Sequence, residues 1–342
     1  MSILAVTCVK NEAPYLLEWL SHHRALGIDH FLVFSNDCED GTDVMLDQLA
    51  RAGWLTHVRH SQQGKKTIQW QALRTAYGHP DYSAAEWVLF FDVDEFIVLD
   101  PSVPDLRALL DRDMDAMILP WRLFGHNGQS AFADAPVTER FTAAATHTIP
   151  VPLGHFFKTI YRRSLFGEMG VHRPKSLANG TARWADAAGE PLPDAIAQMP
   201  NRINSFGHVP TKPLVQLNHY SVRSVAEYVL KTRRGLPNKM HLDLGLKYWV
   251  SRNWNTVEDW AISHHAPATR AVRAEIETDA LRDLHQKAVA WHQERFAQVM
   301  TEVETVDLYW QLQLAGSSHE PDPDTARSYF AFLQSVRRQE GA

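Results

Sequence analysis

Apolar runs alternate with segments of helical spacing along the first hundred residues of the chain. The apolar runs are rich in β-branched and aromatic residues, as is typical of buried strands; they lie at residues 3–9, 30–34, 54–59 and 87–99. The helical segments between them lie at residues 14–26, 43–52 and 65–77. Because strands that alternate with helices favour a parallel sheet with right-handed crossovers, we expect an α/β fold. Ligands bind such sheets outside the carboxyl ends of the strands.

The fourth apolar run contains three carboxylates, Asp92, Asp94 and Glu95. A buried strand keeps such groups only where a cation, a ligand or strong hydrogen bonds compensate for the loss of water. On an extended chain, Asp92 and Asp94 leave the same face about 6.5 Å apart. This spacing favours one shared hard cation, Mg²⁺ or Mn²⁺. The alternative is that the acidic residues face solvent at the end of a strand.

The composition indicates a globular protein that binds a small partner. The chain has 342 residues, of which 45% are hydrophobic, and a net charge of −6 without long basic runs, so a nucleic-acid partner is not expected. Cys8 and Cys38 are too few for a disulfide framework, and we expect reduced thiols. No signal peptide and no apolar run of 18 residues is recognisable, which predicts a soluble, cytoplasmic protein; peripheral membrane association stays open.

The rest of the chain divides into a loop-rich part and a helical part. Residues 101–213 form short pieces between Gly, Pro, Asn and Asp, as is typical of a substrate pocket. Helical spacing is found at 221–234, at 269–303 and around Tyr329. We expect three parts: a nucleotide-binding half at 1–100, an acceptor and metal half at 101–235, and a mainly helical extension at 236–342.

An ordered series of motifs is more specific than any one of them. The series consists of residues 9–12 (Val-Lys-Asn-Glu), 35–43, 91–96 (Phe-Asp-Val-Asp-Glu-Phe), 121–125, 139–142, Lys158 and 217–228. In this order the motifs resemble the GT-A glycosyltransferases, in the family 2-like branch related to glycosyltransferase family 92. The resemblance covers roughly residues 3–235. It implies a GT-A (Rossmann-like) fold with a mostly parallel central sheet, followed here by the C-terminal helical extension.

The resemblance also implies an activity. A member of this branch transfers a sugar from a nucleotide diphosphate sugar, here expected to be a UDP sugar, to a hydroxyl of a glycan or small-molecule acceptor, with inversion at the anomeric carbon. A bound Mn²⁺ or Mg²⁺ would stabilise the departing diphosphate. Because the Gln-x-x-Arg-Trp pattern of processive synthases does not occur in the sequence, we expect a single transfer.

The family motifs imply roles for particular residues. The metal ligands would be Asp92, Asp94 and His219, with His172 as the second candidate histidine. The residues expected to bind the nucleotide sugar are Asn11, Glu12, Asp37, Lys65, Asp92, Lys158, Lys231 and Arg234.

Two groups of cationic residues have a second interpretation. Arg223, Glu227 and Lys231 follow one another at helical spacing, so they can form a solvated salt-bridge stripe; Lys231, Arg233 and Arg234 can instead close over the diphosphate. Lys158 likewise has two interpretations: contact with a phosphate, or packing against aromatic rings.

The acceptor side is less well defined by the sequence. An inverting transfer needs a carboxylate base, for which Glu139 is the first candidate and Asp134 the second. The alternative for Glu139 is an ion pair with a neighbouring arginine. Trp121, Phe124 and His126 are candidates for stacking on the acceptor sugar, although core packing explains Trp121 and Phe124 equally well.

Two other functional classes compete with a glycosyltransferase. A metal-dependent nucleotidyltransferase or phosphohydrolase also uses paired aspartates, but no Gly-rich phosphate loop follows the first strand. A non-catalytic nucleotide-sugar or glycan-binding protein needs Asp37 and the aromatic residues, but not Asp94 together with a metal histidine. Turnover of a UDP sugar and the identity of the released nucleotide separate these classes.

Overall fold

The computed structural model describes all residues except 65, 179, 235–243 and 341–342. The strands are β1 (Ile3–Val9), β2 (His30–Ser35), β3 (Thr56–Arg59), β4 (Trp87–Phe90), β5 (Glu95–Leu99), β6 (Ala116–Leu123), β7 (Ala143–Ala144), β8 (Phe157–Arg162), β9 (Phe166–Glu168), β10 (Lys175–Leu177), β11 (Trp184–Ala185), β12 (Val215–His219) and β13 (Val257–Glu258). Three short 3₁₀ helices are Pro152–His155, Arg163–Leu165 and Ala261–His265.

The α-helices fill the connections of the first half and most of the C-terminal part. They are α1 (Ala13–Ala25), α2 (Thr42–Arg51), α3 (Ile68–Tyr77), α4 (Pro80–Ala84), α5 (Leu106–Leu110), α6 (Val137–Arg140), α7 (Asp194–Ala197), α8 (Val225–Arg234), α9 (Leu246–Arg252), α10 (Ala266–Ile276), α11 (Asp279–Val299), α12 (Val303–Ala315) and α13 (Pro323–Glu340).

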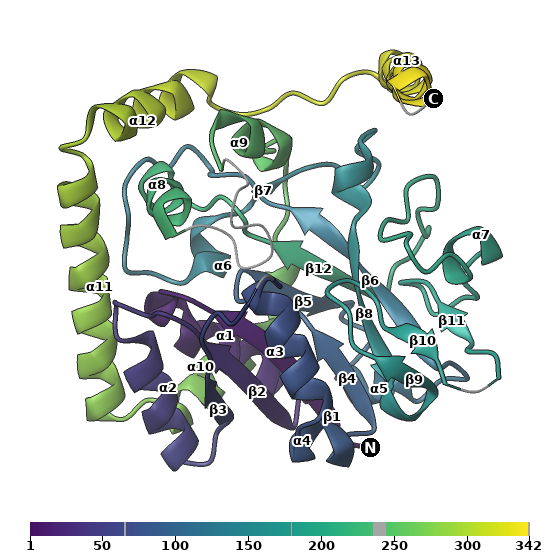
Figure 1. Cartoon of the computed structure of the whole chain (residues 1–342), viewed down its shortest axis with the longest axis horizontal. Coiled ribbons are helices and arrows are strands. Elements are labelled where there is room, and N and C mark those ends of the chain that lie inside the picture. The colour runs from purple at the N-terminus through teal and green to yellow at the C-terminus, as the bar shows by residue number, and fades with distance from the viewer. Residues whose placement is uncertain (65, 179, 235–243, 341–342) are drawn as a thin grey trace.

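One mixed sheet forms the centre of the molecule (Figure 1). Its strand order is β3-β2-β1-β4-β8-β6-β12-β5, with β11 paired to β6. The pairs among β3, β2, β1 and β4 are parallel, as the alternation of strands and helices predicts. β8 is antiparallel to both of its neighbours, and β5 is antiparallel to β12. The predicted α/β fold with a mostly parallel central sheet is therefore confirmed.

Side chains of β1 enter two different cores, because successive residues of a strand point to opposite faces of the sheet. Ile3 and Ala5 pack in the core that includes α1 and α2, whereas Leu4 and Val6 pack in the core that includes α3. The strand is buried on both faces, which explains why its sequence is continuously apolar rather than alternating.

The prediction of one strand at residues 87–99 is wrong. β4 ends at Phe90 between β1 and β8, and β5 begins at Glu95 at the far edge of the sheet, where it pairs with β12. Asp92 and Asp94 lie in the turn between them, and the N–H of Glu95 donates to the carbonyl of Asp92 across 3.0 Å. The argument from side chains on one face of an extended strand therefore does not hold, although both residues still lie at the carboxyl end of β4.

The C-terminal helices cover one side of this unit (Figure 1). Helices α10 and α11 pack against α1, and α11 also contacts α2 and α8; α12 packs on α8 and α9. Within the described part of the chain, none of the helices has the length and apolar character needed to cross a bilayer. The division into domains at residue 235 stays a prediction, because that position lies outside the described residues.

Candidate active site

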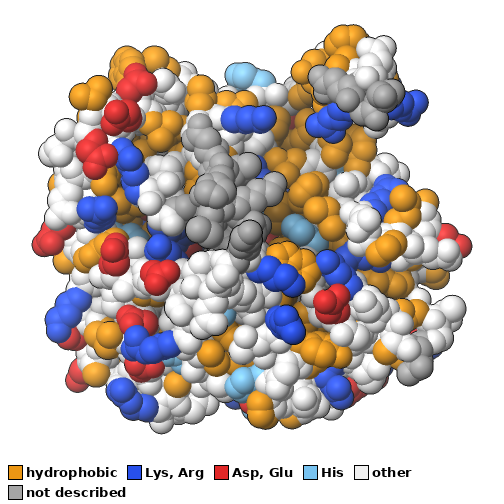
Figure 2. All heavy atoms as spheres, in the orientation of Figure 1, with side chains coloured by type: hydrophobic (Ala, Val, Ile, Leu, Met, Phe, Trp, Pro, Cys, Tyr) orange, Lys and Arg blue, Asp and Glu red, His pale blue; other side chains and the backbone are white. Residues whose placement is uncertain are grey.

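A cleft of about 840 Å³ opens at the carboxyl ends of β1, β2 and β4. Residues that the sequence predicts to contact the nucleotide sugar or the metal line this cleft. Seven of them come from the first half of the chain and from α8: Glu12, Asp37, Asp92, Asp94, Lys158, Lys231 and Arg234. His219 and His172 line the same cleft. Figure 2 shows Lys and Arg side chains on the surface around the middle of this face. The structure thus brings together residues that are more than two hundred positions apart in the sequence, such as Glu12 and Arg234.

Lys158 of β8 holds the first aspartate of the turn. Its Nζ donates to Asp92 Oδ2 across 2.9 Å and lies 3.5 Å from Glu95 Oε2. The side chain of Lys158 is 1% exposed. Burial alone lowers the pKa of this ammonium, but Asp92 and Glu95 outweigh burial and raise it. Lys158 is therefore a buried, permanently charged cation at the floor of the cleft.

Glu95 is a residue that the sequence indicated only as part of the acidic run. It is fully buried, accepts from the backbone N–H of Asp92 across 2.7 Å, and accepts from Trp121 Nε1 across 2.6 Å. Burial raises its pKa to about 8, although Lys158 opposes this shift. Its hydrogen bonds fix the shape of the turn and the orientation of the indole ring, so we interpret Glu95 as a positioning residue.

Asp94 has a different set of partners on the opposite side of the turn. Lys231 Nζ donates to Asp94 Oδ2 across 2.8 Å, and His219 Nε2 lies 3.6 Å from Asp94 Oδ1. Burial alone raises the pKa of Asp94, but Lys231 and His219 outweigh it and hold the pKa well below its ordinary value. Asp94 is therefore an ionised carboxylate in a largely dry site.

The donor set at Asp94 fits a hard metal ion with two protein ligands. The 3.6 Å separation of Asp94 Oδ1 and His219 Nε2 is comparable with the spacing of about 3 Å between neighbouring ligands of an octahedral ion. Asp92 Oδ2 is bonded to Lys158 Nζ, as Asp94 Oδ2 is to Lys231 Nζ, and the role of Asp92 as a metal ligand stays a prediction. Among the described residues, no cluster of three His, Cys, Asp or Glu side chains is arranged for a metal. An ion held by one or two carboxylates usually takes its remaining ligands from water and substrate phosphates.

The two candidate histidines lie on either side of Trp121. The ring centroid of His219 is 4.2 Å from that of Trp121, and the centroid of His172 is 5.5 Å from it. Burial lowers the pKa of both histidines, that of His172 to about 3 with a smaller contribution from Lys158. His172 Nδ1 lies 2.9 Å from the carbonyl of Phe157 and donates to it. Of the two, only His219 is paired with an aspartate of the acidic turn.

The loop after β1 is fixed by arginines. Glu12 forms ion pairs with Arg223, at 3.1 Å, and with Arg234. Arg234 Nη1 also donates to the carbonyls of Lys10 and Asn11 across 2.6 and 3.2 Å. Arg234 and Glu12 therefore hold this loop in place.

Asn11, Asp37 and Arg223 have positive φ values of 52°, 45° and 54°. This region of backbone conformation is rarely occupied by residues other than glycine, and such strain concentrates at binding sites. Asn11 Oδ1 accepts from the backbone N–H of Glu39 across 2.8 Å and lines a neighbouring pocket rather than this cleft. Asp37 is exposed in the cleft, next to Asn36. Lys65 lies outside the described residues.

The interpretation of Arg223, Glu227 and Lys231 as a solvated salt-bridge stripe is wrong for Arg223, which precedes α8, and for Glu227, which lies on it. Both side chains are buried, and both contact Tyr15 of α1. Glu227 pairs with Arg140 and accepts from the hydroxyl of Tyr15 across 2.9 Å. Partners supplied by distant segments, which spacing within one helix cannot reveal, compensate for the burial of these charges.

Neither candidate base lies in the cleft lining. The Glu139 side chain is 55% exposed and pairs with Arg270 at 3.4 Å, as the ion-pair alternative predicts. Asp134 accepts from His285 across 2.7 Å and from Gln286 across 3.1 Å, both on α11. Because these carboxylates are engaged with the C-terminal helices, the structure does not bring them to the aspartates of the turn.

The three aromatic candidates for the acceptor site have different surroundings. Trp121 lines the cleft, next to His219. Phe124 is fully buried against Tyr220, at a centroid distance of 4.6 Å, so core packing explains it. The backbone N–H of His126 donates to Asn253 Oδ1 across 2.8 Å, and its ring packs on Trp249.

Several lining residues were not expected from the sequence. They include Gln69, Trp70, Phe156, Tyr248 and Arg252. No motif marks them, because they come from the first turn of α3, the 3₁₀ segment before β8 and helix α9. Trp70, Phe156 and Tyr248 add aromatic surface on which a base or a sugar ring can stack.

A cleft at the carboxyl ends of a mostly parallel sheet, with a lysine-paired acidic turn, defines an α/β protein built to bind an anionic ligand. Residues 5–192, more than half of the chain, match the family model described as glycosyltransferase family 92. The chain therefore belongs to glycosyltransferase family 92, and the expected family and enzyme class are confirmed.

Curated relatives give the same family over shorter segments. A family 92 protein of Arabidopsis thaliana is 32% identical over 126 residues, which are 35% of this chain and 20% of the relative. A family 92 protein of Ricinus communis is 31% identical over 100 residues, 28% of this chain and 16% of the relative. The aligned part is thus a fifth or less of these longer proteins.

Solved structures of S. aureus TarS are similar to part of the chain. The structure of TarS residues 1–349 has 17% identity and a TM-score of 0.32, and the match covers 48% of each chain. The same TarS fragment in complex with UDP-GlcNAc has 18% identity and a TM-score of 0.29, with 48% of this chain and 46% of the other covered.

Proposed function

We propose that this chain transfers a sugar from a nucleotide diphosphate sugar, a UDP sugar by preference, to a hydroxyl of a glycan or small-molecule acceptor. The transfer is proposed to be single and inverting. Membership of glycosyltransferase family 92 supports the reaction class. The preference for UDP and the inversion come from the resemblance of the motifs.

One observation carries the proposal. Each aspartate of the turn after β4 is paired with a different lysine, Asp92 with Lys158 and Asp94 with Lys231, and all four residues line one large cleft. Two ammonium groups next to two carboxylates form a site where the charges of a diphosphate and of a metal ion can be balanced. A protein that only binds a sugar has no need of this arrangement.

In the proposed reaction, the acceptor oxygen attacks the anomeric carbon of the donor while the bond from that carbon to the diphosphate oxygen breaks. The nucleoside diphosphate leaves with the bonding electrons, and the proton of the hydroxyl passes to a base. Lys158 and Lys231 stabilise the negative charge that develops on the leaving group, because both cations are desolvated and already fixed in place. Asp37, exposed at the end of β2, contacts the base or ribose of the nucleotide.

A divalent ion belongs to the same proposal. Asp94 and His219 would hold Mn²⁺ or Mg²⁺, which acts as a Lewis acid toward the diphosphate. Asp92 is bonded to Lys158 and orients it. Trp121 Nε1 donates to Glu95, which holds the indole ring against the turn. The ring of Trp121 packs against that of His219 and so orients the histidine.

The experiment that tests the proposal is hydrolysis of a panel of UDP and GDP sugars in the presence of Mn²⁺. We compare the native chain with Asp94→Asn and with the control Asp283→Asn, an exposed aspartate on α11. Release of free UDP or GDP that is lost only in Asp94→Asn supports a transferase and identifies the donor. A nucleotidyl product would instead indicate a nucleotidyltransferase, and binding of the sugars without any turnover would indicate a binding protein.

A further inference from the structure

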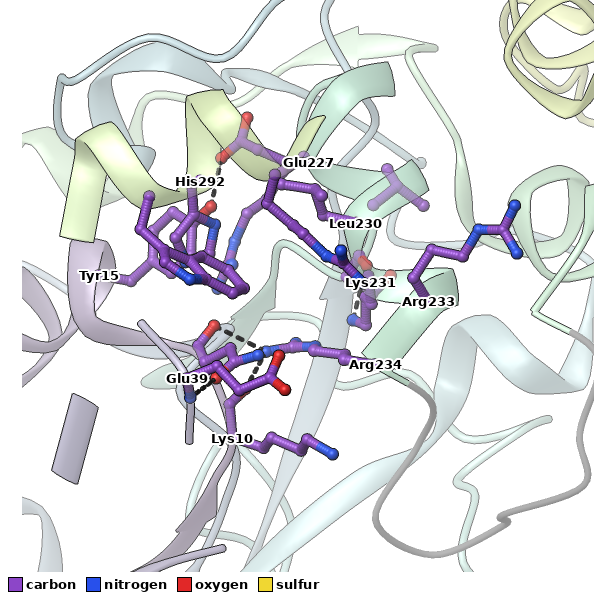
Figure 3. Close-up of a pocket in the computed structure, with 15 residues that line it drawn as sticks. Lys10, Tyr15, Glu39, Glu227, Leu230, Lys231, Arg233, Arg234 and His292 are labelled. Atoms are coloured by element: carbon purple, nitrogen blue, oxygen red, sulfur yellow. Dashed lines mark hydrogen bonds between the residues drawn. The ribbon is translucent and has the colours of Figure 1, made fainter. Parts of the chain in front are cut away.

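A second pocket, of about 200 Å³, lies beside the cleft between α8, the start of α1 and α11 (Figure 3). Tyr15 and His292 approach it from one side, and Lys10, Lys231 and Arg234 from the other. Lys10, Lys231, Arg233 and Arg234 line both cavities, whereas Tyr15, His292 and Arg295 line this one and not the cleft. The pocket is therefore a neighbour of the cleft that shares four cationic residues with it.

Arg223 is the central polar group of this pocket. Its side chain is 7% exposed, its Nη1 donates to Glu12 across 3.1 Å, and its guanidinium carbon lies 3.5 Å from the centre of the Tyr15 ring. Over the described residues, Nε and Nη2 of this guanidinium have no hydrogen-bond partner. Buried donors without a partner are rare because each costs free energy. These two nitrogens form the edge that binds a carboxylate or a phosphate with two hydrogen bonds.

Two more lining residues have a buried polar atom without a partner in the described part of the chain. They are Ser221, through its hydroxyl, and His292, through Nδ1. His292 Nε2 donates to Asp40 Oδ2 across 3.0 Å, which leaves Nδ1 as the ring nitrogen without a partner. The pocket therefore offers an arginine edge and a hydroxyl to an anion.

The charges around the pocket favour an anion. Six cationic side chains line it, those of Lys10, Arg223, Lys231, Arg233, Arg234 and Arg295. Only two carboxylates, Glu39 and Glu227, line it with them. Glu227 is paired with Arg140, and four of the cations are paired with carboxylates outside the lining: Arg223 and Arg234 with Glu12, Lys231 with Asp94 and Arg233 with Glu302. With these partners included, seven cations face five carboxylates. Burial alone lowers the pKa of Arg223, but Glu12 and the other acidic neighbours raise it overall, so its charge is permanent.

We propose that this pocket is a second binding site, separate from the donor cleft, for a small oxyanion that presents a phosphate or carboxylate group to Arg223 and Ser221. Ser221 and Arg223, just before α8, and the lining residues of α8 and α11 lie beyond the segment 5–192 that matches the family model, whereas Lys10, Asn11, Tyr15 and Glu39 lie within it. The site stands on the pocket itself and does not depend on the proposed transfer. Because Lys231 and Arg234 form the wall between the two cavities, an occupant of this pocket lies directly behind the donor site.

Calorimetric titration of the full chain with inorganic phosphate, with and without saturating UDP, tests the proposal. UDP is titrated first, and its measured binding sets the saturating concentration, so that phosphate binding that remains with UDP present reports on the second pocket. Titration with glucuronate, compared with uncharged glucose, distinguishes a carboxylate ligand from a phosphate ligand. We expect one of the two anions to bind, and glucose not to bind.

Three variants test whether the anion binds in this pocket. Arg223→Lys keeps the charge but loses the two-nitrogen edge, and we expect affinity to fall at least about tenfold. Arg295→Gln changes an exposed residue of the rim and is safe for folding; here we expect a loss of about threefold. Lys287→Gln removes an exposed charge from the same helix α11 away from the pocket and leaves affinity unchanged.

Three results would overturn the proposal. The first is no binding of either anion, and the second is binding that is abolished by UDP, which would assign the anion to the donor cleft. The third is binding that Arg223→Lys and Arg295→Gln leave unchanged. If Arg223→Lys does not fold, the comparison of Arg295→Gln with Lys287→Gln decides between the remaining outcomes.

Discussion

Lys231 Nζ and Asp94 Oδ2 are 2.8 Å apart, and their hydrogen bond joins helix α8 to the turn after β4. The turn leads into β5 and α8 follows β12, and these two strands are paired, with Glu95 opposite His219. Lys231 also donates to the carbonyl of Ser221 across 2.8 Å, which fixes its ammonium group. The position of a cation above the acidic turn is therefore set before any ligand arrives.

Replacing Asp94 by asparagine removes one metal ligand and leaves Lys231 without its counter-charge. We expect the rate of transfer to fall by about 10²–10³-fold, as for the loss of one group that stabilises transition-state charge. Steady-state release of nucleoside diphosphate measures the change. A variant that keeps more than a third of the native rate would contradict the role of Asp94.

Removal of divalent ions should have a similar effect. We expect donor hydrolysis to fall at least about tenfold after dialysis against EDTA, because the Lewis acid held by Asp94 and His219 is lost. Added Mn²⁺ should restore the rate in the native chain but not in His219→Ala. Equal activity with and without EDTA would show that Lys158 and Lys231 stabilise the leaving group unaided.

Glu139 and Asp134 should be dispensable for catalysis. Both carboxylates lie outside the cleft lining, bound to residues of α10 and α11. Glu139→Gln and Asp134→Asn are expected to keep kcat within about threefold of the native value, whereas loss of a general base costs about 10² or more. If kcat falls by that factor in either variant while folding is unchanged, the substituted residue is the base.

The buried pair of Glu227 and Arg140 should matter for stability. Glu227→Gln leaves the guanidinium of Arg140 buried without its charge partner, so we expect the free energy of unfolding to fall by about 3–5 kcal/mol. Glu139→Gln breaks an exposed ion pair and is the matched control, with an expected change of about 0.5 kcal/mol or less. Urea unfolding followed by fluorescence measures both values. Equal effects of the two substitutions would contradict the importance of burial.

Two buried histidines predict a loss of stability in acid. Burial lowers the pKa of His22 from 6.5 to about 4 and that of His265 to about 3. Below pH 6.5 the unfolded chain takes up these protons, while the folded protein does not until pH falls through those lower values. The free energy of unfolding therefore has its full value above pH 6.5 with respect to these two histidines. It falls as pH falls toward 4, by about 1.4 kcal/mol per pH unit for each histidine.

Urea midpoints between pH 7 and 4 measure this dependence. His22→Gln keeps a donor for the carbonyl of Ile97, which His22 Nε2 contacts at 2.7 Å, but it does not titrate in this range. We expect a shallower pH dependence in this variant than in the native chain. The exposed His319 is not among the groups that lower these two pKa values and supplies the control, since His319→Gln should leave the slope unchanged.

The sequence was sufficient for the parallel half of the sheet, because the apolar runs and helical segments of residues 1–90 alternate clearly. It was not sufficient for the break after Phe90. Both sides of the break are apolar, so hydrophobicity cannot show that the chain leaves the middle of the sheet and returns at its edge. Asp92 and Asp94 were recognised as site residues from their chemistry, although the geometry first assigned to them was wrong.

Burial of the charged face of α8 could not be predicted for a different reason. The partners of Glu227 are Arg140 and Tyr15, which are distant in sequence, and the spacing within a helix contains no information about such contacts. The same holds for the pocket around Arg223, which needs α11. Motifs identified residues that line the cleft, whereas the residues that hold them in place became visible only in three dimensions.

The separation of β4 and β5 has a consequence for folding. Within the described residues, β5 pairs with β12, and Phe96 lies opposite Asn218 in the register of the two strands. The turn that contains Asp92 and Asp94 therefore has no strand partner on its β5 side until residues 215–219 have been synthesised and have docked. Closing so long a loop is slow. We expect a nascent chain to form the β1–β4 sheet early and to gain the ability to bind a nucleotide sugar only after β12 has joined.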